Sequence, residues 1–386
     1  MVEAEVYPRG ARHADQTRVR RSSPFFVNPV DLPEEEPAMR TARMWKWSLT
    51  VAVVLWARMA WAASVVVTTH PYHGITYITR SDTVPRAVIM HIVEVDLTAP
   101  GIAFEVTGPS GARETTRQTT LDFLNQTRAQ VAVNTHFFST DLATDTWLAG
   151  LAASKGSVYS SFDAQPAAAG QPDQSYAIVP YVAALNIDSA NHAAIVHRDA
   201  NFPDNKHVRE SVTLWNTVSG SAQIVTNGVK TIPAYKDETH PQGELAPNAT
   251  YSNSHSWYAS VPRARTAVGL SQDNTRLILF TVDETGGSSG MTPDEVASLL
   301  IRDYGAYNAL NLDGGGSTTL AMQDPLSRAT SVVNASSGGP RAVGGNLAVF
   351  AAERRPPQLV TVKGPSPWRR PHERHVRAVV PRRRRQ

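Results

Sequence analysis

The chain has 386 residues and a formal net charge of +3, from 37 basic and 34 acidic side chains. Its 41% hydrophobic content supports a buried core, in one large domain or two small ones. The excess arginines gather at the two ends and the central region is nearly balanced, so we expect no nucleic-acid partner. The sequence has no cysteine, which excludes a disulfide framework, a thiolate metal site and a cysteine nucleophile.

Residues 43–63 carry the pattern of a secretory signal peptide. Arg43 and Lys46 form a basic start, an apolar stretch covers 47–57, and Ala60-Trp61-Ala62 supplies small residues for cleavage. The apolar stretch is about ten residues long, short of the roughly twenty that span a bilayer, and an uncleaved anchor is the alternative. We expect an N-terminal extension plus signal peptide over 1–62, cleavage near Ala62, and a secreted or periplasmic protein. It would meet a membrane only if the segment stays uncleaved.

The region after the signal peptide opens with β-rich sequence. Strand-like runs lie at 65–67, 75–78 and 87–97. Leu121 and Leu124 then fall at helical spacing within 119–128, and 130–133 is a short β-branched run that leads into Asn134. This order predicts a helix, a buried strand and a polar residue at the strand end.

The middle of the chain, 139–260, is rich in Ser, Asn, Asp, Gly and His and predicts a loop-rich β region. Its strand-like runs lie at 176–182, 193–196 and 222–225. From 354 onward the chain is rich in Pro and Arg and cannot bury apolar surface, so we expect a basic, disordered tail over 354–386. The folded domain is expected over 63–353.

The segment 276–322 carries the clearest structural pattern. An apolar β run at 276–282 is followed by Thr292-Pro293-Asp294-Glu295, which supplies an N-cap, a first-turn proline and a capping-box glutamate. Gly305 ends this helix, and a second β run covers 307–312. A helix of about twelve residues returns the chain to the starting edge, which makes the two strands parallel. The predicted fold class is α+β, a mixed β-sheet domain with packed helices and this strand-helix-strand unit near the C-terminal end.

Asp283 closes the first of these strands and Asp313 closes the second. Strands that pair directly lie about 4.8 Å apart, so two carboxylates at their carboxyl ends would reach one small ligand. Such a pair can divide the roles of general acid and base, or of nucleophile and acid. The alternative is that each aspartate only caps a strand or holds a turn.

A run of small and hydroxyl residues follows Asp313, namely Gly314, Gly315, Gly316, Ser317 and Thr318. Glycines let a ligand approach the backbone N–H groups, and the hydroxyls add donors, so the run could form an anion nest. The run lacks the lysine of a Walker loop, which disfavours nucleotide binding. A glycine-rich hairpin turn is the alternative.

Two further clusters are candidates for ligand contact. His136 and Phe138 follow Asn134 at a strand end, where sugar sites combine polar groups with aromatic faces; a structural histidine beside a packed aromatic pair is the alternative. Arg265 and Thr266 precede an inward-facing run at 267–270, so an arginine there could hold a phosphate in a bidentate way. Neither a zinc-protease His-Glu-x-x-His pattern nor a Gly-x-Ser-x-Gly elbow occurs.

Six sets of residues, in order along the chain, resemble the phosphodiester glycosidase family: 91–101, 131–138, 265–269, 281–283, 311–318 and 341–343. The resemblance covers most of 87–350. It implies an α+β domain that hydrolyses the bond between a sugar anomeric carbon and a phosphodiester oxygen. It also implies a site lined by Asn134, Arg265, Thr266, Asp283, Asp313, the three glycines and Arg341. The chain departs from the family pattern at Thr135-His136 and at Glu284-Thr285, which bears on the substrate pocket more than on the chemistry.

The sequence therefore predicts a secreted hydrolase of a phosphorylated glycan or sugar-1-phosphodiester, with Asp313 and Asp283 as catalytic residues. The predicted substrate-binding residues are Asn134, His136, Phe138, Arg265, Thr266, Asn311, Gly314, Gly315, Gly316, Ser317, Thr318 and Arg341. The sequence requires no cofactor, and it leaves open whether a divalent cation binds. One alternative is a metal-dependent phosphodiesterase in which Asp283, Asp313 and His136 or His91 hold a cation. The other is a non-catalytic envelope protein that binds anionic glycans.

Overall fold

The computed structural model describes residues 64–139, 144–162, 183–232 and 261–354. All of them belong to the second of two units, Trp61–Gln386. The predicted signal peptide, the strand predicted at 176–182 and the basic tail after 354 lie outside the described residues. Within the described ranges, none of the helices combines the length and apolarity that a membrane span requires.

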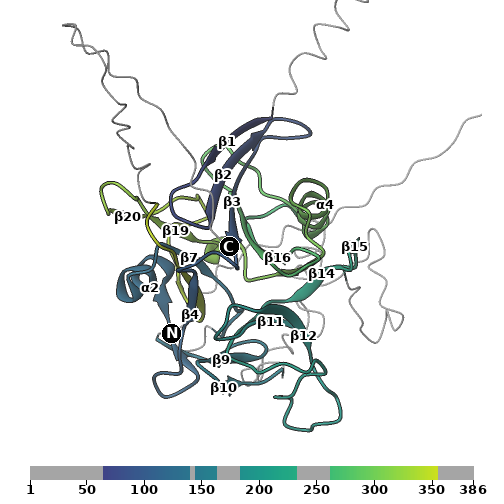
Figure 1. Cartoon of the computed structure of the whole chain (residues 1–386). Coiled ribbons are helices and arrows are strands. Elements are labelled where there is room, and N and C mark those ends of the chain that lie inside the picture. The colour runs from purple at the N-terminus through teal and green to yellow at the C-terminus, as the bar shows by residue number, and fades with distance from the viewer. Residues whose placement is uncertain (1–63, 140–143, 163–182, 233–260, 355–386) are drawn as a thin grey trace, which may run out of the picture. The chain divides into compact units, whose positions relative to one another are not determined.

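The largest sheet has eight strands in the order β1-β2-β3-β17-β16-β18-β14-β15 (Figure 1). Its strands are β1 (Val65–Thr69), β2 (Ile75–Asp82), β3 (Val88–Asp96), β14 (Ala222–Thr226), β15 (Val229–Lys230), β16 (Arg265–Leu270), β17 (Arg276–Val282) and β18 (Asn308–Asn311). Every neighbouring pair in it is antiparallel. The strands predicted near 65, 75, 87, 222, 276 and 307 are confirmed.

Two five-stranded sheets accompany it, in the orders β20-β19-β7-β22-β4 and β10-β9-β13-β11-β12. The first contains β4 (Ala103–Val106), β7 (Val131–Asn134), β19 (Leu320–Gln323), β20 (Thr330–Val332) and β22 (Asn346–Phe350). The second contains β9 (Ala152–Ser154), β10 (Ser157–Ser160), β11 (Ala183–Ile187), β12 (Ala193–His197) and β13 (Asn216–Ser219). Short pairs join β5 (Thr115–Thr116) to β8 (Asp145–Thr146), and β6 (Gln118–Thr119) to β21 (Ala342–Val343).

One apolar core is shared by all three large sheets. Val93 and Leu279 enter it from the eight-stranded sheet, Val133 and Leu347 from the first five-stranded sheet, and Leu185 from the second. A second core fills the space between the opposite face of the eight-stranded sheet and α4 (Pro293–Tyr304). The eight-stranded sheet is thus covered on both faces, and β16 is accordingly buried along its whole length.

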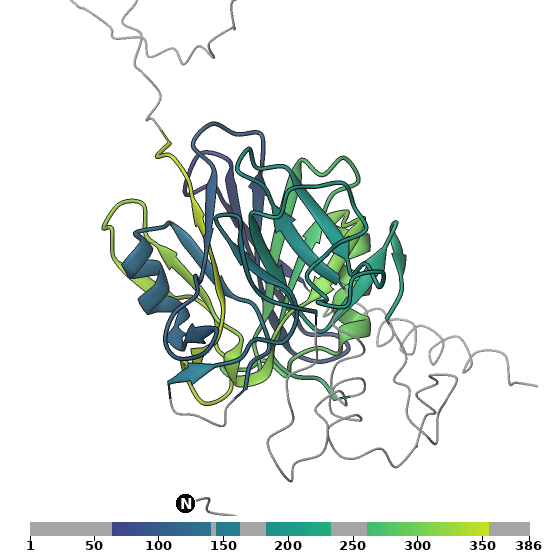
Figure 2. The same cartoon turned by 90° about the horizontal axis from the view of Figure 1, so that it is seen from below.

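Two α-helices occur in the described residues, α2 (Thr120–Thr127) and α4, and they lie on opposite sides of the packed sheets (Figure 2). The predicted ends of α4 are confirmed. The Thr292 hydroxyl accepts a hydrogen bond from the Glu295 N–H, the Glu295 side chain accepts one from the Thr292 N–H, and Gly305 ends the helix at φ 65°. The fold is α+β and dominated by its sheets. The predicted mixed sheet is wrong for the described strands, whose pairs are all antiparallel, including those of the two five-stranded sheets.

The strand-helix-strand unit differs from the prediction in one respect that matters for the site. β17 and β18 do run in the same direction with α4 between them in the chain, but β16 lies between them in the sheet, antiparallel to both. The prediction that the two strands pair directly is wrong. The turn at 271–275 joins β16 to β17 as a hairpin, and such a short connection forms more readily than pairing across a helix. The ends of β17 and β18 are therefore about 10 Å apart.

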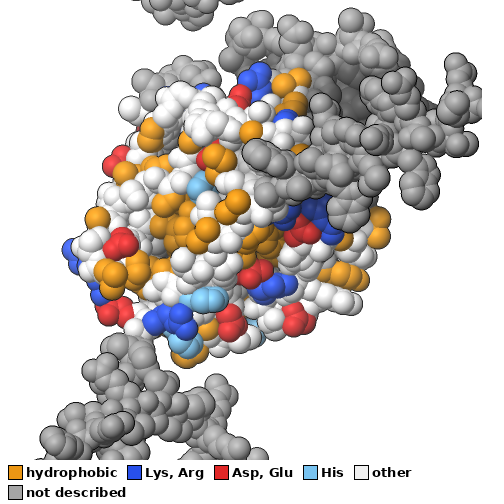
Figure 3. All heavy atoms as spheres, turned by 90° about the horizontal axis from the view of Figure 1, so that it is seen from above, with side chains coloured by type: hydrophobic (Ala, Val, Ile, Leu, Met, Phe, Trp, Pro, Cys, Tyr) orange, Lys and Arg blue, Asp and Glu red, His pale blue; other side chains and the backbone are white. Residues whose placement is uncertain are grey.

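The surface carries both signs of charge. On the face shown in Figure 3, basic and acidic side chains are interspersed around a central area of hydrophobic side chains.

Candidate functional site

Asp313 lies just past the carboxyl end of β18 and is 8% exposed. Its Oδ1 accepts a hydrogen bond from the Gly314 N–H at 2.8 Å, and it also interacts with the Ser317 hydroxyl and with the charge of Arg341. Burial outweighs these contacts and raises the pKa of Asp313 to about 7. This carboxyl group can therefore take up and release a proton near neutral pH.

The glycine run forms a single turn of 3-10 helix, η2 (Gly315–Ser317). Gly315 has φ 59°, a conformation that glycine adopts without strain. Gly316 has a different reason to lack a side chain, because a Cβ there would lie 2.6 Å from Nη2 of Arg341. The turn therefore lets the Arg341 guanidinium pack directly on the backbone beside Asp313.

Most backbone N–H groups of this turn are already bonded within the protein. The Gly314 N–H donates to the Asp313 carboxylate, the Gly315 N–H donates to the Ala264 carbonyl at 2.8 Å, and those of residues 317 and 318 close the turn itself. The turn thus holds Asp313 and the start of β16 together. Because most of its N–H groups are used in this way, few are available to bind an anion as predicted. The alternative of a hairpin turn is also not what the structure shows, because β18 and β19 on either side of the glycines belong to different sheets.

Asn134, at the end of β7, joins three segments around Asp313. Its Nδ2 donates to the Asp313 carbonyl at 2.8 Å. Its Oδ1 accepts from the Thr266 hydroxyl at 2.8 Å and from the Thr319 N–H at 3.0 Å. The structure thus brings together Asn134, Thr266 and Asp313 as predicted, with Asn134 fully buried and holding the backbone of the aspartate.

Buried polar atoms without a hydrogen-bond partner concentrate near the two aspartates. Among the described residues they include Oδ1 of Asn311, Oγ1 of Thr318 and Oγ1 of Thr281. Asn311 uses its Nδ2 group on Ser221 and on the Leu312 carbonyl. An unpartnered buried polar atom costs about 1–3 kcal/mol, and such costs tend to persist where function requires them.

Asp283 follows β17 and is 4% exposed. Its Oδ1 accepts from the Ala335 N–H at 2.8 Å, and its Oδ2 lies 3.2 Å from Nε2 of His91 in β3. Nδ1 of His91 lies 2.8 Å from the Tyr77 hydroxyl in β2. The sequence analysis grouped His91 with Asp283 only as one option for the cation site of the metal-dependent alternative, and it did not include Tyr77. The available signal was a histidine within an otherwise apolar strand at 88–93.

The segment 334–341 links the surroundings of the two aspartates. The Ala335 N–H bonds Asp283, while the Asn334 side chain donates to the Thr318 carbonyl at 3.0 Å and accepts from the Leu320 N–H at 2.7 Å. Both aspartates therefore border one polar region at the ends of β16, β17 and β18. Within the described residues no direct hydrogen bond joins their carboxylates.

The arginines predicted to meet an anion differ sharply in their surroundings. Arg265 is 1% exposed and donates from Nε to the Met291 carbonyl and from Nη2 to the Val261 carbonyl. Arg341 is exposed, lies 3.5 Å from the Ser317 hydroxyl, and has no carboxylate partner in the part of the chain that the structure describes. Arg341 is the better placed of the two to bind an anion, and contact of Arg265 with substrate stays a prediction.

His136 and Phe138 lie at the same strand end but in different environments. His136 is 1% exposed; its Nε2 lies 2.9 Å from the Ser219 backbone nitrogen and 3.1 Å from the Leu151 carbonyl oxygen, and its Nδ1 lies 3.1 Å from the Thr135 hydroxyl. Burial lowers the pKa of His136 to about 4, so the ring is neutral. Phe138 is half-buried, with the Arg117 guanidinium 5.8 Å from the ring centre. His136 is therefore part of the buried interior, and Phe138 is the better placed of the two to contact a substrate.

The cation site considered for the metal-dependent alternative is not assembled. His91 contacts Asp283, but His136 is bonded to Ser219 elsewhere. Across the described ranges, no group of three or more histidine, cysteine or acidic side chains is placed to hold a metal ion.

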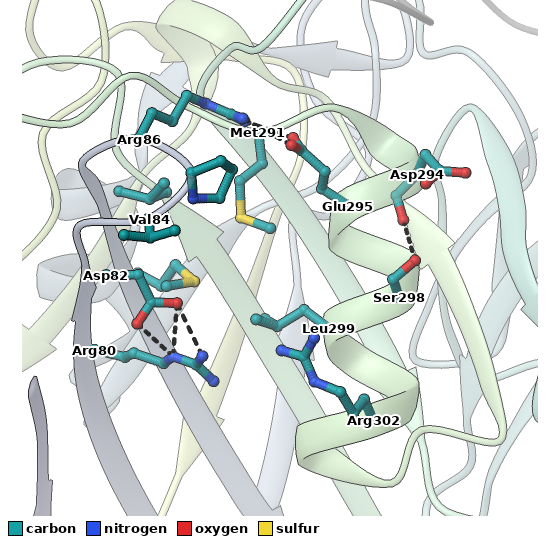
Figure 4. Close-up of a pocket in the computed structure, with 13 residues that line it drawn as sticks. Arg80, Asp82, Val84, Arg86, Met291, Asp294, Glu295, Ser298, Leu299 and Arg302 are labelled. Carbon is teal, nitrogen blue, oxygen red and sulfur yellow. Dashed lines mark hydrogen bonds and ion pairs between the residues drawn. The ribbon is translucent and has the colours of Figure 1, made fainter. Parts of the chain in front are cut away.

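A cavity of about 280 Å³ lies between the β2–β3 connection and α4, away from these residues. Figure 4 shows buried apolar side chains that line it, including Met291 and Leu299, and charged side chains at its rim. Arg86 on this rim is already paired with Glu295 at 2.5 Å. The cavity includes none of the predicted site residues.

Comparison with known proteins gives one family and several relatives. A family model described as phosphodiester glycosidase matches residues 127–350. The mouse N-acetylglucosamine-1-phosphodiester alpha-N-acetylglucosaminidase is 40% identical over 75 residues, which is 19% of this chain and only 14% of the mouse protein.

Among solved structures, the catalytic domain of the zebrafish N-acetylglucosamine-1-phosphodiester alpha-N-acetylglucosaminidase is 23% identical, with a TM-score of 0.46 over 76% of this chain and 83% of that chain. A putative exported protein from Burkholderia pseudomallei is 12% identical, with a TM-score of 0.49 over 75% of this chain and 96% of that chain. A hypothetical protein from Synechocystis is 17% identical, with a TM-score of 0.45 over 75% and 64%.

Proposed function

Since the chain belongs to the phosphodiester glycosidase family and is therefore a glycosidase-type hydrolase, we propose that it cleaves the bond between a sugar anomeric carbon and a phosphodiester oxygen. The first substrate to test is a phosphodiester of N-acetylglucosamine 1-phosphate, because the mouse relative is named for that activity. The single observation that carries the mechanism is the buried Asp313 carboxyl, whose pKa is raised to about 7.

Asp313 acts as the general base in this proposal. A phosphodiester is an acidic leaving group, so its departure needs stabilisation of charge more than it needs a proton. Water attacks the anomeric carbon, its proton passes to the Asp313 carboxylate, and the electrons of the broken bond leave with the phosphodiester oxygen. A base with a pKa near 7 is matched to this step at neutral pH.

Arg341 binds the phosphodiester group. Its guanidinium is exposed, lies against the glycine turn, and acts on the charge of Asp313, so it is near the base without being paired to it. A guanidinium can hold two phosphate oxygens at once and offset the charge that develops on the leaving group.

Asp283 stabilises the positive charge that develops on the sugar in the transition state. A carboxylate that is 4% exposed acts in a region of low dielectric, where it affects a nearby cation more strongly than in water. The Ala335 N–H and His91 supply hydrogen bonds that offset the cost of burying its negative charge.

A panel of sugar-1-phosphodiesters tests this function directly. We expect the purified chain to release free sugar and a phosphomonoester from at least one member, and Asp313→Asn to slow that release about 10²- to 10⁴-fold. Binding of the substrates without turnover by the wild-type chain would favour the anionic-glycan-binding alternative instead.

We also propose that the chain acts after export, on the basis of the signal-peptide pattern at 43–62. Protein recovered from the periplasm or the medium should begin at or near residue 63. Recovery only inside the cell, with residues 43–62 still attached, would contradict export.

A further inference from the structure

Behind Asp283 lies a chain of hydrogen bonds that begins at Tyr77 and passes through His91. Tyr77 belongs to β2 and His91 to β3, and both precede residues 127–350, the stretch that the family model matches. Sheet register brings them together, because β3 pairs with β2 on one side and with β17, which leads into Asp283, on the other.

The two contacts of His91 fit one arrangement of donors and acceptors. A carboxylate only accepts hydrogen bonds, so the 3.2 Å contact with Asp283 requires a proton on Nε2 of His91. In the neutral ring Nδ1 is then an acceptor, and the Tyr77 hydroxyl, 2.8 Å away, donates to it. Burial, and to a smaller extent the charge of Asp283, raise the pKa of Tyr77, which keeps the proton on its hydroxyl group.

The side chains of Tyr77, His91 and Asp283 lie together at one end of the sheet. On the same face, β3 continues as Val93 and Val95 and β17 begins as Leu277 and Leu279, all in the shared apolar core. A histidine that is 5% exposed is therefore placed only where these strands reach Asp283. Two apolar side chains could fill this position without the free-energy cost of burying polar groups. Packing alone therefore does not explain the presence of Tyr77 and His91.

We propose that His91 is a positioning residue for Asp283 and that Tyr77 fixes the orientation of the His91 ring, so that Asp283 presents an oriented carboxylate to the sugar in the transition state. This inference rests on the proposed function. His91 and Tyr77 do not touch the substrate; the Nε2–H group of His91 holds one carboxylate oxygen while the Ala335 N–H holds the other.

The test is a comparison of kcat and KM. Because the charge on the sugar develops only in the transition state, loss of the Asp283 orientation should lower kcat and leave KM nearly unchanged. We expect His91→Phe to lower kcat about 10- to 100-fold, as for other partners that orient a catalytic group, with KM within about twofold. His91→Gln keeps an N–H donor and should recover part of the loss. Tyr77→Phe should lower kcat by a few-fold.

His197 provides the matched control. It also pairs with a carboxylate through one ring nitrogen, Nδ1 to Glu210 at 2.8 Å, but it lies in β12 of another sheet. His197→Phe should leave kcat and KM within about twofold of the wild type, even where it lowers the melting temperature.

The inference is overturned if folded His91→Phe keeps kcat within twofold of the wild type, or if His91→Phe and His197→Phe lose activity only in proportion to lost folded protein. It is also overturned if His91→Phe changes KM and leaves kcat unaltered. The proposed function fails separately: a wild-type chain that turns over no sugar-1-phosphodiester removes both claims. An active wild type with inactive Asp313→Asn and unaffected His91→Phe removes this inference alone.

Discussion

The most informative single residue is Asp313, because burial of its carboxyl group both sets its pKa for catalysis and lowers the stability of the folded protein. Burial raises the pKa of its carboxyl group to about 7, so near neutral pH the protein carries a carboxylate in a place that disfavours the charged form. Stability and activity are therefore expected to oppose each other at this residue.

Activity should rise with pH through about 7. The carboxylate form of Asp313 is the base, and it becomes populated as the pH passes the pKa of the buried group. The profile of kcat against pH should show an acid limb near pH 7 in the wild type. Asp313→Asn should lower kcat about 10²- to 10⁴-fold. An acid limb centred near pH 4, the usual range of an exposed aspartate, would contradict the assignment.

The stability of the protein should show the opposite trend. The folded pKa of Asp313 lies above its unfolded value of 3.8, so the stabilising effect of the protonated group is complete below about pH 4 and is lost as the pH rises through about 7. Asp313→Asn should therefore melt at a higher temperature than the wild type at pH 8, and the gap should narrow towards pH 4. Thermal unfolding at several pH values measures this, and a constant gap would argue against a buried, titrating Asp313.

Arg341 should control affinity for the phosphodiester. We expect Arg341→Ala to raise KM about tenfold, the loss of a charge-assisted contact of roughly 1.4 kcal/mol, without a large change in melting temperature. Arg302→Ala is the matched control, since Arg302 is exposed on α4 and bonds its neighbour Asp303. Arg341→Ala should also lower kcat, because the guanidinium offsets charge that develops on the leaving group. Wild-type values of both KM and kcat would remove Arg341 from the site.

At the scale of elements, local chemistry determined what could be predicted. The capping box at Thr292, the stop at Gly305 and the β run at 276–282 are encoded by adjacent residues, and all three are confirmed. The insertion of β16 between β17 and β18 depends on long-range pairing and was missed. The contact of Tyr77 with His91, and of His91 with Asp283, depends on that same register, so sequence spacing alone could not reveal it.

The cap of α4 should contribute stability and no catalysis. Thr292→Ala removes the side-chain acceptor of the Glu295 N–H, which should cost about 1 kcal/mol in the free energy of unfolding. α4 packs on the face of the eight-stranded sheet opposite to the shared core, so kcat should stay within about twofold. A large loss of kcat in a folded Thr292→Ala variant would indicate that α4 also shapes the site.

At the scale of the whole molecule, three sheets share one core, and the candidate site lies where that core ends in polar groups. Asn134 comes from one five-stranded sheet, while Thr266 and the two aspartates come from the strands of the eight-stranded sheet or directly follow them. The composition of the sequence indicated a domain with a buried core, and the ordered motifs indicated the family. The arrangement of three sheets around one core required the structure, because no single strand specifies its partners.

The central claim is that water attacks the sugar carbon and leaves the phosphorus atom untouched. Hydrolysis of a sugar-1-phosphodiester in water enriched in heavy oxygen, followed by mass spectrometry of both products, tests it most directly. The glycosidase mechanism predicts that the label appears in the released sugar, at the anomeric oxygen. Label in the phosphate product would show cleavage of the P–O bond and contradict the mechanism proposed for Asp313.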